Sequence, residues 1–350
     1  MVNRVSFDNF RGLKHLELPE LSRITLLTGR NNAGKSSVLE GIYLLASATQ
    51  PESFASLNAM RLLPLSLDST DLWENVFYNF NNSSPIQIQA VINGEDISCS
   101  FVRDDTFTPA SETLSFAQNF MNGKSYALCY SLTRNNYFET GHFSPGPDGT
   151  RKTVSNLTGV FTPYLPSVFA FSSNFHGTDD LFAEWCGQSM LNGKRDSVIA
   201  SMKTIDSGIS DYFVVPQNGK AKIYVKIDNN SIPVRLTGDG TVRLLQFSLC
   251  ANLNPGSLIL IDEIENGFHY SMQKEFWKTM AKAAKTNNCQ IIATTHSYEC
   301  IQNAVDGIGE VGMENEFCLY RVENEDGENR AFRLDGRLVA FSVDKNMEVR

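Results

Sequence analysis

Residues 29–37 carry the side chains most able to do chemistry, because they read Gly-Arg-Asn-Asn-Ala-Gly-Lys-Ser-Ser and match the pattern G-x-x-x-x-G-K-[ST]. Glycines at such a turn let backbone N–H groups surround an anion, and the N-terminus of a following helix adds partial positive charge. The pattern predicts a site for ATP, in which Lys35 reaches the β- and γ-phosphates and Ser36 ligates Mg²⁺. The residues expected to contact the nucleotide are Gly29, Asn31, Asn32, Ala33, Gly34, Lys35, Ser36 and Ser37.

The flanks of this motif have the form that phosphate binding needs. Ile24–Thr28 is an apolar run typical of a short buried strand, and Ser36–Ala48 carries apolar residues at helical spacing. The glycines therefore fall at a strand-to-helix turn. In an ordinary surface loop the motif would be a chance match, and the two flanks favour the phosphate-binding interpretation.

A second apolar run, Leu258–Ile261, ends in two carboxylates, Asp262 and Glu263. Asp262 is expected to hold Mg²⁺ together with Ser36, while Glu263 orients and deprotonates the attacking water. An acidic pair at a strand end can also be a solvated loop start. The upstream P-loop favours the catalytic interpretation.

His296 follows a further apolar run, Gln290–Thr294, and is expected at the same carboxyl edge of the sheet as Asp262. There a histidine can contact the γ-phosphate, although a cap for the following helix is the alternative. Upstream, Thr237, Gly238 and Gly240 precede an apolar helix and predict a second anion site. A nucleotide held between two copies of the chain would explain why one chain carries two such sites.

The composition is that of a globular protein, with 42% hydrophobic and 20% charged residues among 350. A net charge of −9 would repel nucleic acid unless basic residues gather on one face. Seven scattered cysteines without C-x-x-C spacing favour reduced thiols over disulfides or zinc. The sequence has no run long enough to span a bilayer and no signal-peptide pattern, so we expect a cytoplasmic protein that does not engage a membrane.

The rest of the sequence predicts hairpins, helices and one buried β-α-β unit. Residues 106–166 are rich in Ser, Thr, Asn and Gly, and we expect an insertion of lower regularity there, with His142–Thr150 as its clearest loop. Lysines at 274, 278, 282 and 285 recur at helical spacing and indicate a solvated face. The hairpins are expected at Val2–Phe10 with Leu13–Leu21, Ile86–Ile92 with Ile97–Val102, Lys220–Ile227 with Ile232–Leu236, and Phe317–Val322 with Arg330–Leu334; helix is expected over Asp179–Ile205 and Tyr270–Lys285.

The order of these motifs resembles the ABC-type ATPase heads of the SMC, RecF and OLD families. The resemblance covers the opening Phe-Asp-Asn-Phe-Arg-Gly-Leu at 7–13, the P-loop, Gly-Asp-Gly-Thr at 238–241, Leu-Ile-Leu-Ile-Asp-Glu at 258–263 and Thr-Thr-His-Ser at 294–297. It implies that Thr237–Gly240 forms the signature loop that reaches a partner's γ-phosphate, and that Glu265–His269 joins the two sites. It also implies that His296 is the switch histidine and that Arg11 lies near the nucleotide.

The sequence also departs from these families. No sustained heptad pattern lies between Ala48 and Leu236, so a coiled-coil arm is not expected. Only about fifty residues follow His296, too few for the Toprim nuclease domain of OLD proteins. The glutamine that would complete the Mg²⁺ site is not assigned.

The fold class we expect is α/β: a P-loop NTPase of ABC-ATPase type with a central mostly parallel sheet, an antiparallel β subdomain and a helical and hairpin insertion. We expect an ATPase half at 1–60, a variable insertion at 61–215 and a second ATPase half at 216–350. The resemblance implies a homodimer or higher homo-oligomer in which chains close head to tail around ATP and Mg²⁺. It also implies that this assembly regulates a separately encoded effector, as in bacterial defence against phage. The alternative is a DNA-repair or chromosome-maintenance ATPase that clamps nucleic acid directly.

Overall fold

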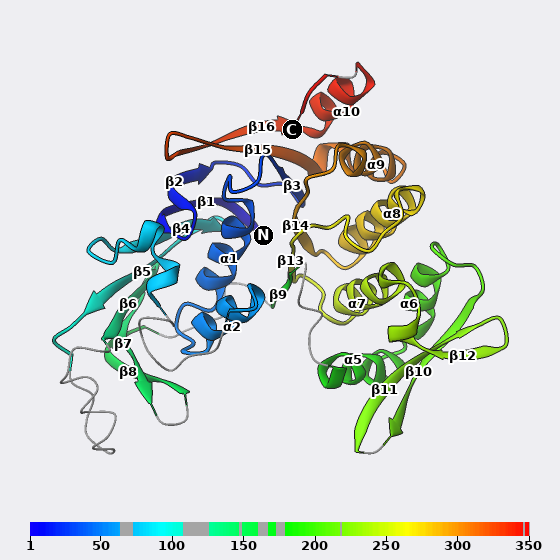
Figure 1. The fold of residues 1–350 in the computed structure, drawn as a ribbon, viewed down its shortest axis with the longest axis horizontal. Coiled ribbons are helices and arrows are strands. Elements are labelled where there is room, and N and C mark those ends of the chain that lie inside the picture. Colours follow the sequence, from blue (N-terminus) through cyan, green and yellow to red (C-terminus); the bar gives the residue numbers. More distant parts are fainter. Residues whose placement is uncertain are drawn as a thin grey trace. The chain divides into compact units, whose positions relative to one another are not determined.

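The computed structural model describes residues 1–63, 73–107, 126–146, 149–159, 167–172, 179–217, 219–345 and 347–349. The chain divides into two compact units (Figure 1). Unit 1 contains Met1–Leu21, Gly29–Leu165 and Val322–Phe332, and unit 2 contains Ser22–Thr28, Pro166–Arg321 and Arg333–Arg350. The P-loop belongs to unit 1, and the acidic strand end belongs to unit 2.

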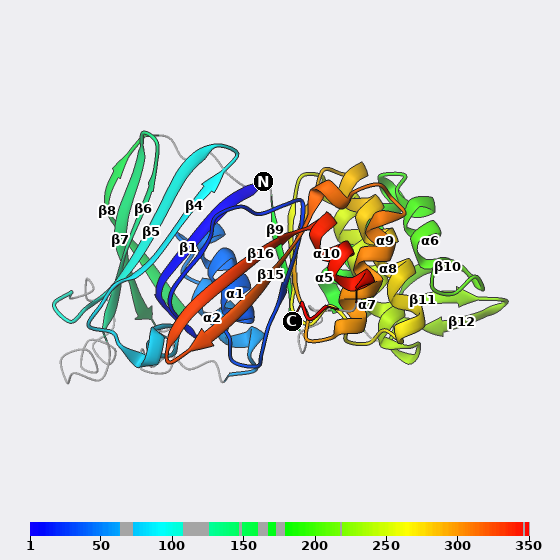
Figure 2. The same cartoon turned by 90° about the horizontal axis from the view of Figure 1, so that it is seen from above.

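Unit 1 is built on a seven-stranded antiparallel sheet with the order β2-β1-β4-β5-β6-β7-β8. Figure 2 shows this sheet with α1 packed against it. In β4, buried and exposed residues alternate, as expected for a sheet with one covered face. Its elements are β1 (Val2–Phe10), β2 (Leu13–Leu18), α1 (Lys35–Ala46), α2 (Ser53–Met60), β4 (Ile86–Ile92), β5 (Glu95–Asp104), β6 (Ala127–Arg134), β7 (Tyr137–Gly146) and β8 (Gly149–Thr158), with 3₁₀ turns η1 (Glu74–Val76) and η2 (Tyr78–Phe80).

The core of unit 1 is aromatic. Phe54 of α2 makes edge-on contact with Phe101 of β5, with ring centroids 5.3 Å apart, and a second such contact with Phe143 of β7 at 6.1 Å. Phe143 also stacks on Tyr130 at 4.5 Å. Strands β5, β6 and β7 therefore share one core with helix α2.

The expectation for residues 106–166 is wrong where the structure describes them. β6, β7 and β8 continue the sheet, with one register shift between Thr140 and Gly141 in the β7–β8 pairing. In the expected loop His142–Thr150, the described residues 142–146 and 149–150 are strand, and Ser144 pairs with Arg151. Strands rich in Ser, Thr and Asn have the composition of a loop. Pairing with neighbouring strands decides their conformation instead.

Unit 2 is built on a six-stranded sheet with the order β16-β15-β3-β14-β13-β9. β15, β3, β14, β13 and β9 run parallel, and β3, β13 and β14 are buried at every position. The predicted central, mostly parallel sheet is confirmed. Its strands are β3 (Ile24–Thr28), β9 (Val168–Phe171), β13 (Leu258–Ile261), β14 (Gln290–Thr294), β15 (Phe317–Glu325) and β16 (Glu328–Asp335); the tip of the β15–β16 hairpin, Val322–Phe332, is assigned to unit 1.

Helices pack around this sheet and enclose a core that includes Phe247, Phe276 and Trp277. They are α5 (Asp179–Leu191), α6 (Arg195–Met202), α7 (Asp239–Leu253), α8 (Tyr270–Thr286), α9 (Tyr298–Gly309) and α10 (Gly336–Asp344), with 3₁₀ turns η3 (Val234–Leu236) and η4 (Glu314–Glu316). Of the described helices, none is long and apolar enough to cross a membrane. All seven cysteines are free thiols.

A separate three-stranded sheet, β10-β11-β12, lies beside α5 and α6 (Figure 2). β11 (Lys220–Ile227) and β12 (Asn230–Pro233) form the predicted hairpin, although residues 234–236 are a 3₁₀ turn and not strand. The third strand, β10 (Ile209–Gln217), pairs with β11 and was not predicted.

Candidate functional site

The P-loop in unit 1 has a backbone that only glycine can adopt at two positions. Gly29 has φ 135°, and a Cβ there would lie 2.0 Å from the Val322 carbonyl oxygen. Gly34 has φ 103°, and its Cβ would lie 2.4 Å from Cδ2 of Leu13. Gly34 is also the N-cap of α1 and offers no side chain to cap the first backbone N–H groups of the helix. The glycines therefore shape a turn that presents a helix N-terminus.

Asn329, at the tip of the β15–β16 hairpin, braces this turn within unit 1. Its side-chain amide donates to the carbonyl oxygens of Gly12, at 3.2 Å, and Ala33, at 3.3 Å, while its oxygen accepts the Lys14 N–H at 2.9 Å. Asn329 is buried. Sequence analysis missed this residue, because nothing near position 329 signals a contact with position 33.

Lys35 is almost fully buried and folds back over its own loop. Its ammonium group donates to the carbonyl oxygens of Gly29 and Arg30, both at 2.9 Å. Ser37 lies one residue beyond Ser36, and its Oγ accepts the Gly12 N–H at 3.3 Å. Asn31 and Asn32 are exposed at the crown of the loop, and Asn32 has φ 62°. The two hydroxyls thus lie on the first turn of α1, as the motif requires.

Arg11 lies in a buried ion-pair network in unit 1. Its guanidinium is 3.2 Å from the Glu40 carboxylate and donates to both oxygens of Asn75 and to Asn58. Burial lowers the pKa of Arg11, and the Glu40 carboxylate opposes that shift. Through these contacts Arg11 links the turn after β1 to its neighbours within unit 1. Its contact with the nucleotide stays a prediction.

In unit 2, Asp262 and Glu263 leave the carboxyl end of β13 beside the end of β14. The Thr294 hydroxyl donates to Oδ1 of Asp262 at 2.6 Å and accepts the Glu263 N–H at 2.8 Å. Glu263 has φ 50°, which is strained for a residue with a side chain. Such strain is common at functional sites, and here the hydrogen bonds from its surroundings maintain it. β3 is the other neighbour of β14, and the chain passes from its last residue, Thr28, into the P-loop.

The Glu263 side chain is fixed but accessible, with 37% of its area exposed. Asn266 donates to Oε2 at 2.6 Å, and the His296 ring nitrogen Nε2 lies 3.9 Å from Oε1. The backbone N–H of His296 donates to Glu265 at 2.8 Å. Ser297 caps α9 by accepting the Cys300 N–H, so the helix-cap interpretation of His296 is wrong.

Arg243 of α7 is a further site residue that sequence analysis missed. It is 4% exposed, and Nη1 donates to the Glu263 carbonyl oxygen at 3.3 Å. Burial lowers the pKa of its guanidinium, and the surrounding carboxylates of Asp239, Glu263, Glu265 and Asp262 oppose that shift. In the sequence, Arg243 looks like any arginine of an amphipathic helix. Only the fold shows which carboxylates it faces.

The glycine-rich start of α7 packs closely on the loop after Glu263. A Cβ on Gly240 would lie 2.9 Å from the Gly267 carbonyl oxygen, and a Cβ on Gly267 would lie 2.8 Å from Asp239. Gly238 is the N-cap of α7, and nothing lies within 4 Å of a Cβ built on it. Thr237 turns its hydroxyl to the Val234 carbonyl at 2.7 Å. The predicted signature loop, Thr237–Gly240, therefore contacts the predicted joining loop, Glu265–His269, directly.

The residues present suit ATP with Mg²⁺. Within unit 1, the turn at Gly29 and Gly34 packs too closely on Val322 and Leu13 to admit a side chain, and it presents the N-terminus of α1. The Ser36 hydroxyl of unit 1 and, separately, the Asp262 carboxylate of unit 2 are oxygen donors of the kind that Mg²⁺ prefers. Parallel strands β3, β14 and β13, with a P-loop after the first and an acidic pair after the third, define a P-loop ATPase of ABC type. Its fold is that of an SMC/RecF-like head.

Comparison with known proteins agrees with this class. The chain belongs to the AAA ATPase domain family, whose model matches residues 1–142 and 178–301. It is 23% identical over 353 residues to an ATP/GTP phosphatase of Helicobacter pylori, covering 93% of each chain. It is 46% identical over 44 residues to the DNA replication and repair protein RecF of Hahella chejuensis, covering 13% of this chain and 12% of RecF. In fold it is similar to an SMC head bound to the C-winged helix domain of ScpA, with a TM-score of 0.52, 13% identity and coverage of 95% and 97%.

Proposed function

We propose that this AAA-type ATPase binds ATP with Mg²⁺ and hydrolyses it, with Glu263 as the general base. The observation that carries the proposal is the set of contacts that hold Glu263, from Thr294, Asn266 and Arg243, beside Asp262 at a strand end. Membership of the ATPase family and similarity to an ATP/GTP phosphatase support it. The binding residues are those of the P-loop, with Ser36 and Asp262 as the Mg²⁺ ligands.

Each group would have a separate task. The N–H groups at the start of α1 and the Lys35 ammonium bind the phosphates, and bound Mg²⁺ neutralises charge on the phosphate oxygens. Glu263 orients the attacking water and accepts its proton, while His296 contacts the γ-phosphate. The left-handed backbone at Glu263, fixed by Thr294 and Arg243, determines where this carboxylate points.

We further propose that two chains close head to tail, each P-loop facing the partner's Thr237–Gly240 loop. The support is the direct packing of Gly240 on Gly267, because a phosphate bound at the start of α7 would press on the loop that begins at Glu263. Hydrolysis would then reopen the pair, and the movement would regulate a separately encoded effector. In the similar SMC structure a head binds another protein, a domain of ScpA.

Replacing Glu263 by Gln tests the base. The variant keeps size and hydrogen-bonding ability, so ATP affinity should be unchanged while turnover falls by about 10²–10⁴-fold. The matched control is Glu299→Gln, which changes an exposed glutamate on α9 and should leave turnover unchanged. Wild-type turnover by the Glu263→Gln protein would refute this assignment.

The same variant tests dimerisation, because it should trap the ATP-bound state. Light scattering should give twice the monomer mass with ATP and Mg²⁺ and the monomer mass without ATP. Gly238→Asp, which places a carboxylate at the open N-cap of α7, should abolish the ATP-dependent increase. An unchanged mass of Glu263→Gln with ATP would exclude the head-to-tail pair.

The biological output we propose is defence of a bacterium against phage. Expressing the chain together with its genomic neighbours in a susceptible host should reduce phage plating. Lys35→Ala should abolish that reduction, because the effector would lose its ATP-driven regulator. Equal protection with and without a working P-loop would remove the ATPase from the pathway.

A further inference from the structure

The outer face of the β10–β12 sheet in unit 2 is not covered by any described helix. α5 and α6 pack on the inner face, where Tyr212 and Val225 are fully buried and the Tyr212 hydroxyl lies 2.6 Å from Ser189 of α5. Side chains alternate along a strand, so residues 220, 222, 224 and 226 of β11 face the other way. These residues are Lys, Lys, Tyr and Lys.

Three lysines lie on this face. Lys220 and Lys222 are exposed, and among the described residues none of Lys220, Lys222 and Lys226 forms an ion pair. Asp211 lies opposite Lys226 and is bound by the Arg195 guanidinium, whose Nε donates at 2.9 Å. The sheet therefore presents a local positive stripe on a chain with a net charge of −9.

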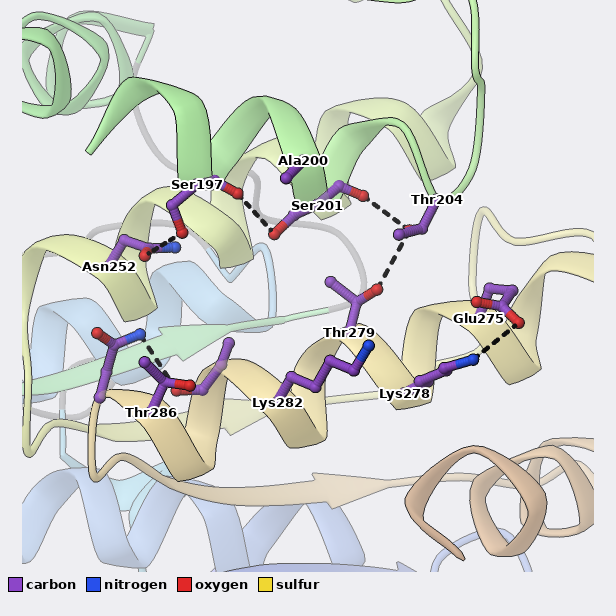
Figure 3. A pocket seen from close by; sticks show the side chains of 12 residues that line it. Ser197, Ala200, Ser201, Thr204, Asn252, Glu275, Lys278, Thr279, Lys282 and Thr286 are labelled. Carbon is purple, nitrogen blue, oxygen red and sulfur yellow. Dashed lines mark hydrogen bonds and ion pairs between the residues drawn. The ribbon is translucent and has the colours of Figure 1, made fainter. Parts of the chain in front are cut away.

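Two of the four lysines of α8 differ in this respect. Lys274 and Lys278 both bind Glu310, the C-cap residue of α9, at 2.7 and 2.5 Å, and these two cations lower the Glu310 pKa to about 2. Figure 3 shows the cleft between α6 and α8, with a volume of about 250 Å³, which Lys278 also lines. Thr204 bonds Thr279 there at 3.1 Å, and Ser197 donates to Asn252 at 2.9 Å. The charge of Lys278 and these hydroxyls therefore already have partners within the protein.

An aromatic pair lies between the lysines of the sheet face. Phe213 of β10 is directly opposite Tyr224 of β11, and their rings are stacked, with centroids 5.8 Å apart and planes 8° apart. Both side chains are only partly buried. Proteins bind unpaired bases by stacking them on aromatic rings, and they bind the adjacent phosphates with cationic side chains. This face offers both kinds of group.

We propose that this sheet face binds single-stranded nucleic acid, with phosphates along the lysine stripe and bases against Phe213 and Tyr224. Alternate residues on a strand are about 6.7 Å apart, which is close to the separation of successive phosphates in an extended single strand. A duplex presents its bases edge-on and hidden from such rings, so the aromatic pair favours a single strand. An acidic protein segment would use the lysines but not the rings.

The test measures binding of the full chain to a fluorescein-labelled oligothymidylate of about 16 nucleotides by anisotropy at several salt concentrations. Three phosphate contacts predict a slope of about −2 for log affinity against log salt. The Lys220→Gln, Lys222→Gln, Lys226→Gln triple variant should lose at least about tenfold in affinity and most of that slope. Phe213→Leu with Tyr224→Leu should lose about fivefold or more and keep the slope.

The matched control removes three lysines from α8 by Lys274→Gln, Lys278→Gln and Lys282→Gln, and it should bind like wild type. Turnover of ATP without nucleic acid should be the same in the sheet-face variants and wild type, so failure of this proposal is distinct from failure of the ATPase proposal. No binding at low salt would overturn the proposal. Equal loss in the α8 control, tighter binding of duplex, or equal binding of polyglutamate would also overturn it.

Discussion

The two predicted parts of the nucleotide site are built in opposite ways. In unit 1 the P-loop is shaped by missing side chains, since Gly29 and Gly34 adopt left-handed backbone where a Cβ would overlap its neighbours. In unit 2 the acidic strand end is shaped by side chains that are present, since Thr294 and Arg243 hold the strained backbone of Glu263. One region depends on close packing that admits no side chain, and the other depends on hydrogen bonds.

Because of this difference, substitutions in the two regions should impair different steps. A side chain added to the P-loop changes the backbone that binds phosphate, so binding should be lost. A conservative change at the strand end leaves the fold intact and alters only the group that handles the proton, so turnover should be lost. Substitutions in the two units should therefore affect different kinetic constants.

The largest effect on ATP binding is expected from Lys35→Ala. The ammonium is buried against the loop, and by our proposal it binds phosphate oxygens; charge-assisted bonds of this kind contribute about 1.5–3 kcal/mol each. ATP affinity, measured by titration calorimetry, should fall by about 100-fold. Lys14→Ala removes an exposed lysine of unit 1 that pairs with Glu328, and it should bind ATP normally.

Gly34→Ala should be next. The left-handed φ and the overlap with Leu13 predict a loss of about 1–3 kcal/mol of stability together with weaker ATP binding. Gly94→Ala separates the effect of the left-handed φ from the effect of the overlap. Gly94 also has a positive φ, 82°, but nothing lies within 4 Å of a Cβ built on it. If both variants bind ATP equally well, the close packing of Gly34 against Leu13 is not needed to shape the P-loop.

Arg243→Lys sharpens the description of the strand end. Lysine keeps the charge but does not reproduce the guanidinium geometry at the Glu263 carbonyl. We expect kcat to fall about tenfold with KM nearly unchanged, because the base loses its alignment while the P-loop is untouched. Arg337→Lys, on the exposed face of α10, is the control. A rise in KM alone would assign Arg243 to binding.

The smallest effect concerns acid stability and lies outside both regions. Burial would raise the pKa of Glu139, but the Lys152 ammonium and the Tyr130 and Tyr137 hydroxyls lower it below its usual 4.5. A lowered folded-state pKa gives stability that is complete above about pH 4.5 and is lost as pH falls through the lower folded value. Melting curves from about pH 6 to about pH 3 should show a small loss of stability that Glu139→Gln lacks.

Local patterns in the sequence predicted most of the fold. The buried strands β3, β13 and β14 are continuous apolar runs, and the P-loop motif is contiguous, so both are visible in a short window. β10 was missed because its residues, with a proline near the end, show no simple alternation. β6–β8 were missed because their polar residues match loop composition.

The contacts that complete the site could not be predicted in the same way. The Asn329 side chain reaches the Lys14 backbone across 315 positions of sequence, and Arg243 of α7 reaches Glu263 at the end of β13. Such pairs depend on sheet order and helix packing, which a single sequence does not display. They are also the residues that hold the predicted groups in position.

The division of labour between the units can be measured in one experiment. ATP affinity and the rate of phosphate release should be determined side by side for wild type, Lys35→Ala and Glu263→Gln. We expect Lys35→Ala to lose binding, and Glu263→Gln to bind ATP like wild type and release almost no phosphate. Phosphate release by Glu263→Gln at the wild-type rate, or wild-type ATP affinity in Lys35→Ala, would contradict the assignment of binding to the P-loop and hydrolysis to the acidic strand end.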